Sequence, residues 1–130
     1  MASKRSTARR NTFWAVLLVV AVIWAISSAQ AEDGRTAERT LVRNAETKRV
    51  VCRVFRARCG AAWRVVLCES RGNPRAVGGA GERGLFQIHP IHFRWAQPHR
   101  LFDPTWNAKV AYRLSRGGTN WSHWTCRWVA

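Results

Sequence analysis

Three acidic residues are the candidates for acid–base chemistry in the chain beyond residue 49: Glu69, Glu82 and Asp103. Glu69 directly follows the apolar run 65–68, so its carboxyl group is expected to lie beside packed core. Burial raises the pKa of a carboxyl group and keeps it protonated near neutral pH, which is the state that a general acid needs. Position alone explains Glu69 equally well as an exposed charge at a helix end.

The other two acids have simpler structural explanations. Asp103 precedes Pro104, and Asp at the N-cap followed by Pro at the first helical position is a common start of a helix. Glu82 lies among glycines and next to Arg83, where a solvated loop charge is the simpler interpretation. Glu69 is therefore the first candidate for a catalytic acid, and Glu82 is the second.

Helical patterns precede Glu69. A first set of apolar residues between 51 and 59 has the spacing of one helical face, and Gly60 then interrupts the pattern. The run 61–68 predicts a buried helix that ends at 69–70, before the breaker-rich residues 71–74. The first set consists of Val51, Val54, Phe55 and Cys59.

The second half of the chain alternates loops with one further helix. The segment 77–83 holds three glycines and predicts a loop, and 84–88 is expected to form a short buried turn or strand. Beyond Asp103, Trp106, Val110 and Leu114 have helical spacing up to Gly117. The sequence thus predicts a small, mostly α domain with a glycine-rich loop and minimal β structure.

The N-terminal segment 1–31 is typical of an export leader. Its basic start is followed by fourteen apolar residues, 13–26, and it ends in Ala29-Gln30-Ala31, a pattern that signal peptidases cleave. A retained membrane anchor is the alternative, because 11–31 carries no charge. Residues 32–49 are polar and predict a linker or a solvated helix, which leaves 50–130 for the folded domain.

The chain is strongly basic, with a net charge of +15. Removing the leader leaves 18 basic against 7 acidic residues, a net charge of +11. Such a charge favours an acidic partner: a nucleic acid, an anionic lipid surface or a cell-wall polymer. Hydrophobic residues at 47% argue against a largely disordered chain.

Four cysteines beyond a leader favour two disulfides, with three possible connectivities. Neither the cysteines nor the histidines have a familiar zinc spacing, so we predict no metal and no cofactor. The cysteines are Cys52, Cys59, Cys68 and Cys126, and the histidines are His89, His92, His99 and His123.

Several motifs in the domain resemble those of the lysozyme-like soluble lytic transglycosylase family. The residues 68–76 (CESRGNPRA), the glycine loop, 84–88 (GLFQI) and 107–112 (NAKVAY) occur in the order and spacing of that family. The Cys-Glu-Ser triplet and the C-terminal segment from Trp121 to Cys126 are similar to the catalytic domain of resuscitation-promoting factors. The resemblance covers residues 60–126.

The resemblance implies an α+β lysozyme-like fold in which Glu69 is the general acid. It further implies that Gln87 and Gly84 line the substrate under the scissile bond, and that Tyr112 is the aromatic residue of the later helix. Ser70, Asn73 and Phe86 complete the expected substrate-binding set, as residues of these motifs that offer hydrogen bonds or a flat apolar face.

A disulfide between Cys68 and Cys126 is implied by the resemblance to resuscitation-promoting factors, and this leaves Cys52 and Cys59. Seven residues of continuous helix separate two Cα atoms by about 10 Å, beyond the roughly 7 Å that a disulfide tolerates. If these two are bonded, the helix must bend or break within 53–58. The alternative is a straight helix with different pairing or free thiols.

The resemblance implies a secreted or wall-associated monomer that cleaves the β-1,4 bond between MurNAc and GlcNAc in peptidoglycan. Many lytic transglycosylases have one catalytic carboxyl group, whereas goose-type lysozymes use additional acids in this region. Glu82 therefore leaves both the transglycosylase and the hydrolase open, and the former is expected. The rival is a cationic protein that binds membranes or nucleic acid on an inert scaffold, although no recognised nucleic-acid motif is present.

Overall fold

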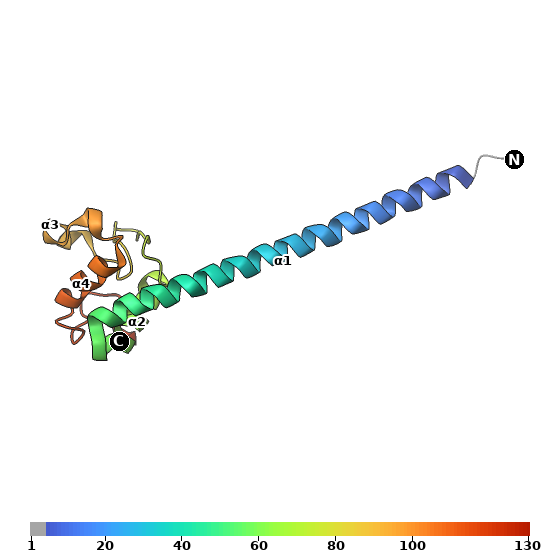
Figure 1. Ribbon diagram of the computed structural model, residues 1–130. Helices are drawn as coiled ribbons and strands as arrows, with labels where there is room; N and C mark the ends of the chain where they lie inside the picture. The colour runs from blue at the N-terminus through green and yellow to red at the C-terminus, as the bar shows by residue number, and fades with distance from the viewer. Residues whose placement is uncertain (1–4) are drawn as a thin grey trace. The chain divides into compact units, whose positions relative to one another are not determined.

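The computed structural model describes the backbone of residues 5–130 and the side chains from residue 17 onward. The chain divides into two compact units, Met1–Thr40 and Leu41–Ala130. Helix α1, Arg5–Phe55, begins in the first unit and ends in the second (Figure 1). The first four residues of the predicted leader lie outside the described residues.

The first unit consists of the N-terminal part of α1. Its large apolar side chains between Leu17 and Ile26 are exposed. Among the described residues, one helix is long and apolar enough to cross a membrane, and its apolar part lies near the N-terminus. A signal sequence has the same properties, so both interpretations of residues 1–31 fit this helix.

The polar segment 32–49 is helical, as the second of its two interpretations expected. From Leu41 onward it belongs to the same compact unit as the rest of the domain. Thr47 is buried, and Val51 in the next turn is fully buried. Residues 41–49, which the sequence assigned to a linker or a solvated helix, thus form part of the folded unit.

The chain turns sharply between α1 and the next helix. Arg56 has φ +50° and opens a single 3-10 turn, Arg56–Arg58, after which α2 runs over Cys59–Ser70. A disulfide joins Cys52 to Cys59, whose Cα atoms are 4.5 Å apart. A continuous helix would hold these atoms about 10 Å apart, so the turn is what permits the bond.

Helix α2 leads into an irregular segment that carries almost no β structure. Ala62, Val65 and Val66 form the buried side of α2, which ends at Arg71 in a left-handed conformation. In residues 71–90 the ordered pairings are two isolated bridges, from Arg83 to Val77 and to Ile88. The prediction of a mostly α domain with minimal β structure is confirmed.

The remaining elements are short. Helix α3, Phe93–Ala96, lies between two 3-10 turns, Pro90–His92 and Pro98–Arg100, in a stretch for which the sequence predicted no element. Helix α4 is Pro104–Leu114, and the Asp103 carboxylate accepts the Trp106 N–H at 2.7 Å. This confirms the predicted cap. A tail with one 3-10 turn, Arg127–Val129, closes the chain.

An aromatic cluster joins the helices to the tail. The Phe55 ring stacks on Phe86 at 5.4 Å and on Trp121 at 5.7 Å between ring centroids. Trp121 in turn contacts Trp124 at 5.0 Å. Such pairs contribute about 0.5–1.5 kcal/mol each beyond burial, so the tail is a structural part of this small core.

Candidate active site

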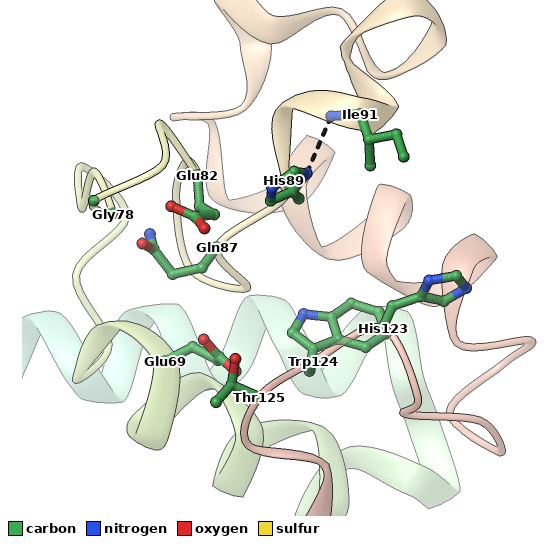
Figure 2. A pocket seen from close by; sticks show the side chains of 10 residues that line it. Glu69, Gly78, Glu82, Gln87, His89, Ile91, His123, Trp124 and Thr125 are labelled. Carbon is green, nitrogen blue, oxygen red and sulfur yellow. Dashed lines mark hydrogen bonds between the residues drawn. The ribbon is translucent and has the colours of Figure 1, made fainter.

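The end of α2 presents Glu69 beside the core. Val65 and Val66 precede Glu69 by four and three residues, so they lie on the same side of the helix, and both are fully buried. The Glu69 side chain is consequently partly buried at the edge of a cavity, as Figure 2 shows. Of the two sequence interpretations of Glu69, this geometry matches the carboxyl group beside packed core.

The surroundings of Glu69 raise the pKa of its carboxyl group. Desolvation by burial is the largest cause, and the negative charge of Glu82 acts in the same direction. The backbone N–H of Cys126 donates to Glu69 Oε1 at 3.0 Å and opposes both, because it stabilises the carboxylate. The net effect keeps Glu69 protonated to higher pH than an exposed glutamate, as a general acid requires.

The glycine loop carries Glu82 to the opposite side of the cavity. Gly78 N–H donates to the Glu82 carbonyl at 2.9 Å, and Gly81 N–H donates to the Gly78 carbonyl at 3.0 Å. The Glu82 side chain accepts the Ala80 N–H at 3.0 Å, which holds the carboxylate against its own loop. A Cβ on Gly78 would collide with Glu82 Oε2 and lie 2.7 Å from Gln87 Oε1.

Gln87 is held by the backbone around it. Its Nε2 donates to the Ala76 carbonyl at 3.2 Å and to the Gly84 carbonyl at 2.8 Å. Its own backbone has φ +47°, so the turn, rather than a regular strand, directs the side chain toward the cavity. The amide is therefore positioned before any substrate binds.

Asn107 of α4 holds that turn from behind and is fully buried. Its Oδ1 accepts the Phe86 N–H at 2.9 Å, and its Nδ2 donates to the carbonyls of Arg83 and Leu101 at 2.9 and 2.8 Å. A Cβ on Gly84 would collide with Asn107 and with the Leu101 carbonyl. Asn107 is not among the predicted site residues, although an amide side chain between Trp106 and Val110, on the apolar side of α4, marks it in the sequence.

The cavity enclosed by these groups has a volume of about 460 Å³. Glu69, Glu82, Gln87, Gly78, Gly79 and Thr125 form one part of its lining, and His89, Ile91, His123 and Trp124 form the other (Figure 2). Three of these ten residues are among those predicted for the site: Glu69, Glu82 and Gln87. The structure brings those three together.

The other residues proposed for substrate binding do not line this cavity. Phe86 is fully buried in the aromatic cluster, and Gly84 packs against Asn107. Ser70 is buried, and its hydroxyl donates to the Val66 carbonyl at 3.1 Å. Their physical role is to shape the helix end and the turn that carry Glu69 and Gln87.

Asn73 and Tyr112 also lie elsewhere. The Asn73 side chain accepts the Arg75 N–H at 3.0 Å and so stabilises the turn after α2. Tyr112 is 43% exposed and packs edge-on against Phe55 at 5.3 Å between ring centroids. Both assignments rested on motif position, which does not reveal the direction of a side chain.

Four lining residues were not predicted as site residues, because they come from segments without a helical pattern: His89, Ile91, His123 and Thr125. Trp124 also lines the cavity, and its indole N–H donates to the Phe86 carbonyl at 2.7 Å. The histidines had been considered only as metal ligands. Among the described residues, no three His, Cys, Asp or Glu side chains form a group that could hold a metal ion.

The second disulfide closes the site from the tail. A disulfide joins Cys68 to Cys126, with their Cα atoms 6.1 Å apart. Cys126 is also the residue whose backbone N–H donates to Glu69, so the donor is covalently bonded to the residue that precedes the acceptor. No free cysteine is found in the described part of the chain.

Comparison with known proteins gives one match. A family model described as "lysozyme like domain" matches residues 55–126, which is more than half of the chain. The matched range includes Glu69, the glycine loop, Asn107 and Cys126. A search of curated proteins found no match, and a search of solved structures found none.

Proposed function

Because this chain belongs to the lysozyme-like lytic transglycosylase family, we propose that it cleaves the β-1,4 bond between MurNAc and GlcNAc in peptidoglycan, with Glu69 as the general acid. Domains of this family are generally enzymes that act on peptidoglycan. The assignment to Glu69 rests on one observation: its carboxyl group is partly buried at the edge of the cavity, and this burial raises its pKa.

The chemistry needs a proton on the leaving oxygen and stabilisation of an oxocarbenium-like centre. Glu69 donates its proton to the glycosidic oxygen as the bond from C1 of MurNAc breaks, and GlcNAc leaves with a free hydroxyl group. In the transglycosylase, the 6-hydroxyl of the same MurNAc then attacks C1. Its proton returns to the Glu69 carboxylate, and the product carries a 1,6-anhydro ring.

Two observations on Glu82 favour this outcome over hydrolysis. Its carboxylate is occupied by the Ala80 N–H of its own loop, and its negative charge raises the pKa of Glu69, second to the desolvation of that carboxyl group. Both fit a residue that keeps Glu69 protonated. In the alternative, Glu82 activates a water molecule that attacks C1, and the product has a reducing end.

The setting of the enzyme follows from its charge and its N-terminal segment. The net charge of +15, or +11 without residues 1–31, would hold the chain on an anionic cell wall, with an attraction that weakens as salt is added. Residues 1–31 would direct the chain out of the cytoplasm as a cleaved leader, or keep it at the membrane as an anchor. The proposal requires no cofactor, and a monomer suffices because one chain supplies the cavity.

The test is product analysis after digestion of purified peptidoglycan. Mass spectrometry should find anhydro-muropeptides, which are lighter than hydrolysis products by one water molecule. Glu69→Gln keeps the side-chain shape but cannot donate the proton, so kcat should fall by about 10²- to 10⁴-fold. Glu46→Gln, which neutralises an exposed acid outside the cavity lining, is the matched control and should keep the parent rate.

Two results would overturn the proposal. Cleavage by Glu69→Gln at the parent rate would remove Glu69 from the reaction. A parent protein that binds sacculi but releases no muropeptide would favour the cationic binding protein. Products with reducing ends would leave the muramidase assignment in place and replace the transglycosylase by the hydrolase.

A further inference from the structure

Three of the four histidines of the chain gather beside the cavity. The rings of His92 and His123 meet edge to face, with their centroids 5.5 Å apart and their planes at 86°. His89 and His123 both line the cavity, and Figure 2 shows His89 between Glu82 and Ile91, with His123 beyond Trp124 as seen from Glu69. The proposed chemistry at Glu69 uses none of these three side chains.

The hydrogen bond that His89 accepts shows which of its ring nitrogens carries the proton in the neutral form. Its Nδ1 accepts the Ile91 N–H at 3.2 Å, so the proton of the neutral ring lies on Nε2. His89 can thus donate one hydrogen bond without gaining charge. Gaining a second proton on Nδ1 would break the bond to Ile91, which caps the 3-10 turn Pro90–His92.

The described ring contacts of His92 are with His123 and Trp95, and neither partner is an acid. Its ring contacts Trp95 at 6.1 Å, and the Arg113 guanidinium lies 4.7 Å from the centroid of the Trp95 ring. Partial burial lowers the pKa of His92, and the charges of His123 and His89 lower it further. Glu69 and Glu82 are the acids of the cavity lining, and neither is among these causes.

Such a cluster is suited to binding an anion. Two imidazolium groups at this separation repel each other, and a carboxylate bound beside both rings would offset the repulsion. Anion binding and proton uptake then favour each other by linkage. The exposed rings of His89 and His123 keep the cluster open to a group on a large substrate.

We propose that His89, His92 and His123 form a subsite for a carboxylate of peptidoglycan, carried by the stem peptide or by the lactyl group of muramic acid. This inference rests on the proposed muramidase function and adds to it the recognition of the acidic, peptide-bearing sugar. A neutral GlcNAc polymer offers no such group. The subsite therefore distinguishes peptidoglycan from chitin, and does so more strongly at acid pH, where imidazole groups gain charge.

The test is equilibrium binding of the full chain in the Glu69→Gln background, which removes turnover. Sacculi freed of phosphate polymers and chitin are compared as insoluble ligands at pH 5 and pH 8, at one ionic strength. The double variant His92→Gln/His123→Gln should bind sacculi about 3- to 10-fold more weakly than its parent at pH 5, and equally at pH 8. Binding to chitin should not change.

His99→Gln is the matched control, because His99 is exposed and does not line the cavity. It loses the same titratable group and should bind like its parent on both ligands at both pH values. Equal unfolding temperatures of the variants would show that the comparison concerns folded protein. Glycan strands stripped of stem peptides separate the two carboxylate sources: if the histidines still matter there, the lactyl group is the ligand, and if not, the peptide is.

Three outcomes would overturn the inference: a double variant that binds sacculi like its parent at pH 5, an equal loss in His99→Gln, or an equal loss on chitin. The failure of the proposed function looks different. In that case the Glu69→Gln parent would bind sacculi no better than chitin at either pH, and the chain with Glu69 intact would release no muropeptides.

Discussion

Cys126 is linked to the end of α2 twice, by a disulfide to Cys68 and by its backbone N–H, which donates to Glu69 Oε1 at 3.0 Å. The two links serve one geometry. The disulfide fixes the tail beside α2, and the tail then supplies the donor that orients the carboxyl group. The same tail contributes Thr125 and Trp124 to the cavity lining (Figure 2).

Removing the Cys68–Cys126 bond should therefore affect stability and catalysis together. The double variant Cys68→Ser/Cys126→Ser loses the crosslink between two residues that are 58 positions apart in the sequence. Because the unfolded chain is then less restricted, the free energy of unfolding should fall by about 4 kcal/mol. The value of kcat/KM should also fall, because the tail is part of the cavity. Denaturant unfolding and turnover on peptidoglycan measure the two effects.

The other disulfide is the natural control. The double variant Cys52→Ser/Cys59→Ser loses a crosslink between residues seven positions apart, so the free energy of unfolding should fall by about 2.5 kcal/mol. Neither cysteine lines the cavity. Its kcat/KM should stay near that of the parent at temperatures where the protein is folded. A Cys68/Cys126 variant with full activity would show that the tail does not position Glu69.

The charge of Glu82 should extend the activity to higher pH. A general acid works while it is protonated, so activity is lost as pH rises through the pKa of Glu69. Burial raises that pKa most, and Glu82 raises it further. Glu82→Gln removes the second cause, lowers the pKa of Glu69 and should shift the alkaline limb of the kcat/KM profile to lower pH.

Glu46→Gln provides the comparison for this profile, because it removes one negative charge from an exposed position of α1. Its alkaline limb should coincide with that of the parent. An unchanged limb in Glu82→Gln, or a shift to higher pH, would contradict the electrostatic role of Glu82. A flat loss of activity at all pH values would instead support Glu82 as a catalytic base.

The parts of the site that sequence predicted are those fixed by local patterns. The Asp103 cap depends on four consecutive residues, and the position of Glu69 depends on the apolar turn just before it. The mostly α fold follows from such patterns as well. The turn after Phe55 was predicted only conditionally, because it depends on which cysteines pair.

The parts that sequence did not predict are fixed by contacts between distant segments. The Trp124 indole reaches the Phe86 carbonyl across 38 residues, and this brings the neighbouring His123 to the cavity. Phe86 itself shows the converse case. In a segment as short as 84–88, no periodicity tells whether an aromatic side chain enters the core or faces a substrate.

Asn107 should be among the most sensitive positions of the fold. Replacing it by Ala leaves the Phe86 N–H and the Leu101 carbonyl buried without this partner, and removes a partly buried bond from the Arg83 carbonyl. A buried polar group without a hydrogen bond costs about 1–3 kcal/mol, so Asn107→Ala should lower the free energy of unfolding by about 3 kcal/mol or more. Denaturant titration measures the loss.

Asn120→Ala makes a suitable comparison for Asn107→Ala. The Asn120 side chain accepts one hydrogen bond, from the exposed Ser122 N–H at 3.0 Å, and water can replace it. This variant should lose about 1 kcal/mol or less. Similar losses for the two variants would mean that the three bonds of Asn107 do not hold the turn that carries Gln87.

Two adjacent glycines of the loop should respond differently to an added methyl group. A Cβ on Gly78 would collide with Glu82 Oε2 and crowd Gln87 Oε1, whereas a Cβ on Gly79 would meet no atom within 4 Å. Neither glycine has a positive φ, so alanine introduces no backbone strain at either position.

Gly78→Ala should therefore leave stability nearly unchanged, because the ends of two flexible side chains, Glu82 and Gln87, can move. It should lower kcat/KM by about 10- to 100-fold, since those side chains then leave the geometry in which they face Glu69. Gly79→Ala should lose far less activity. Comparable losses in the two variants would show that the loop needs flexibility or access for substrate, and not the present placement of Glu82 and Gln87.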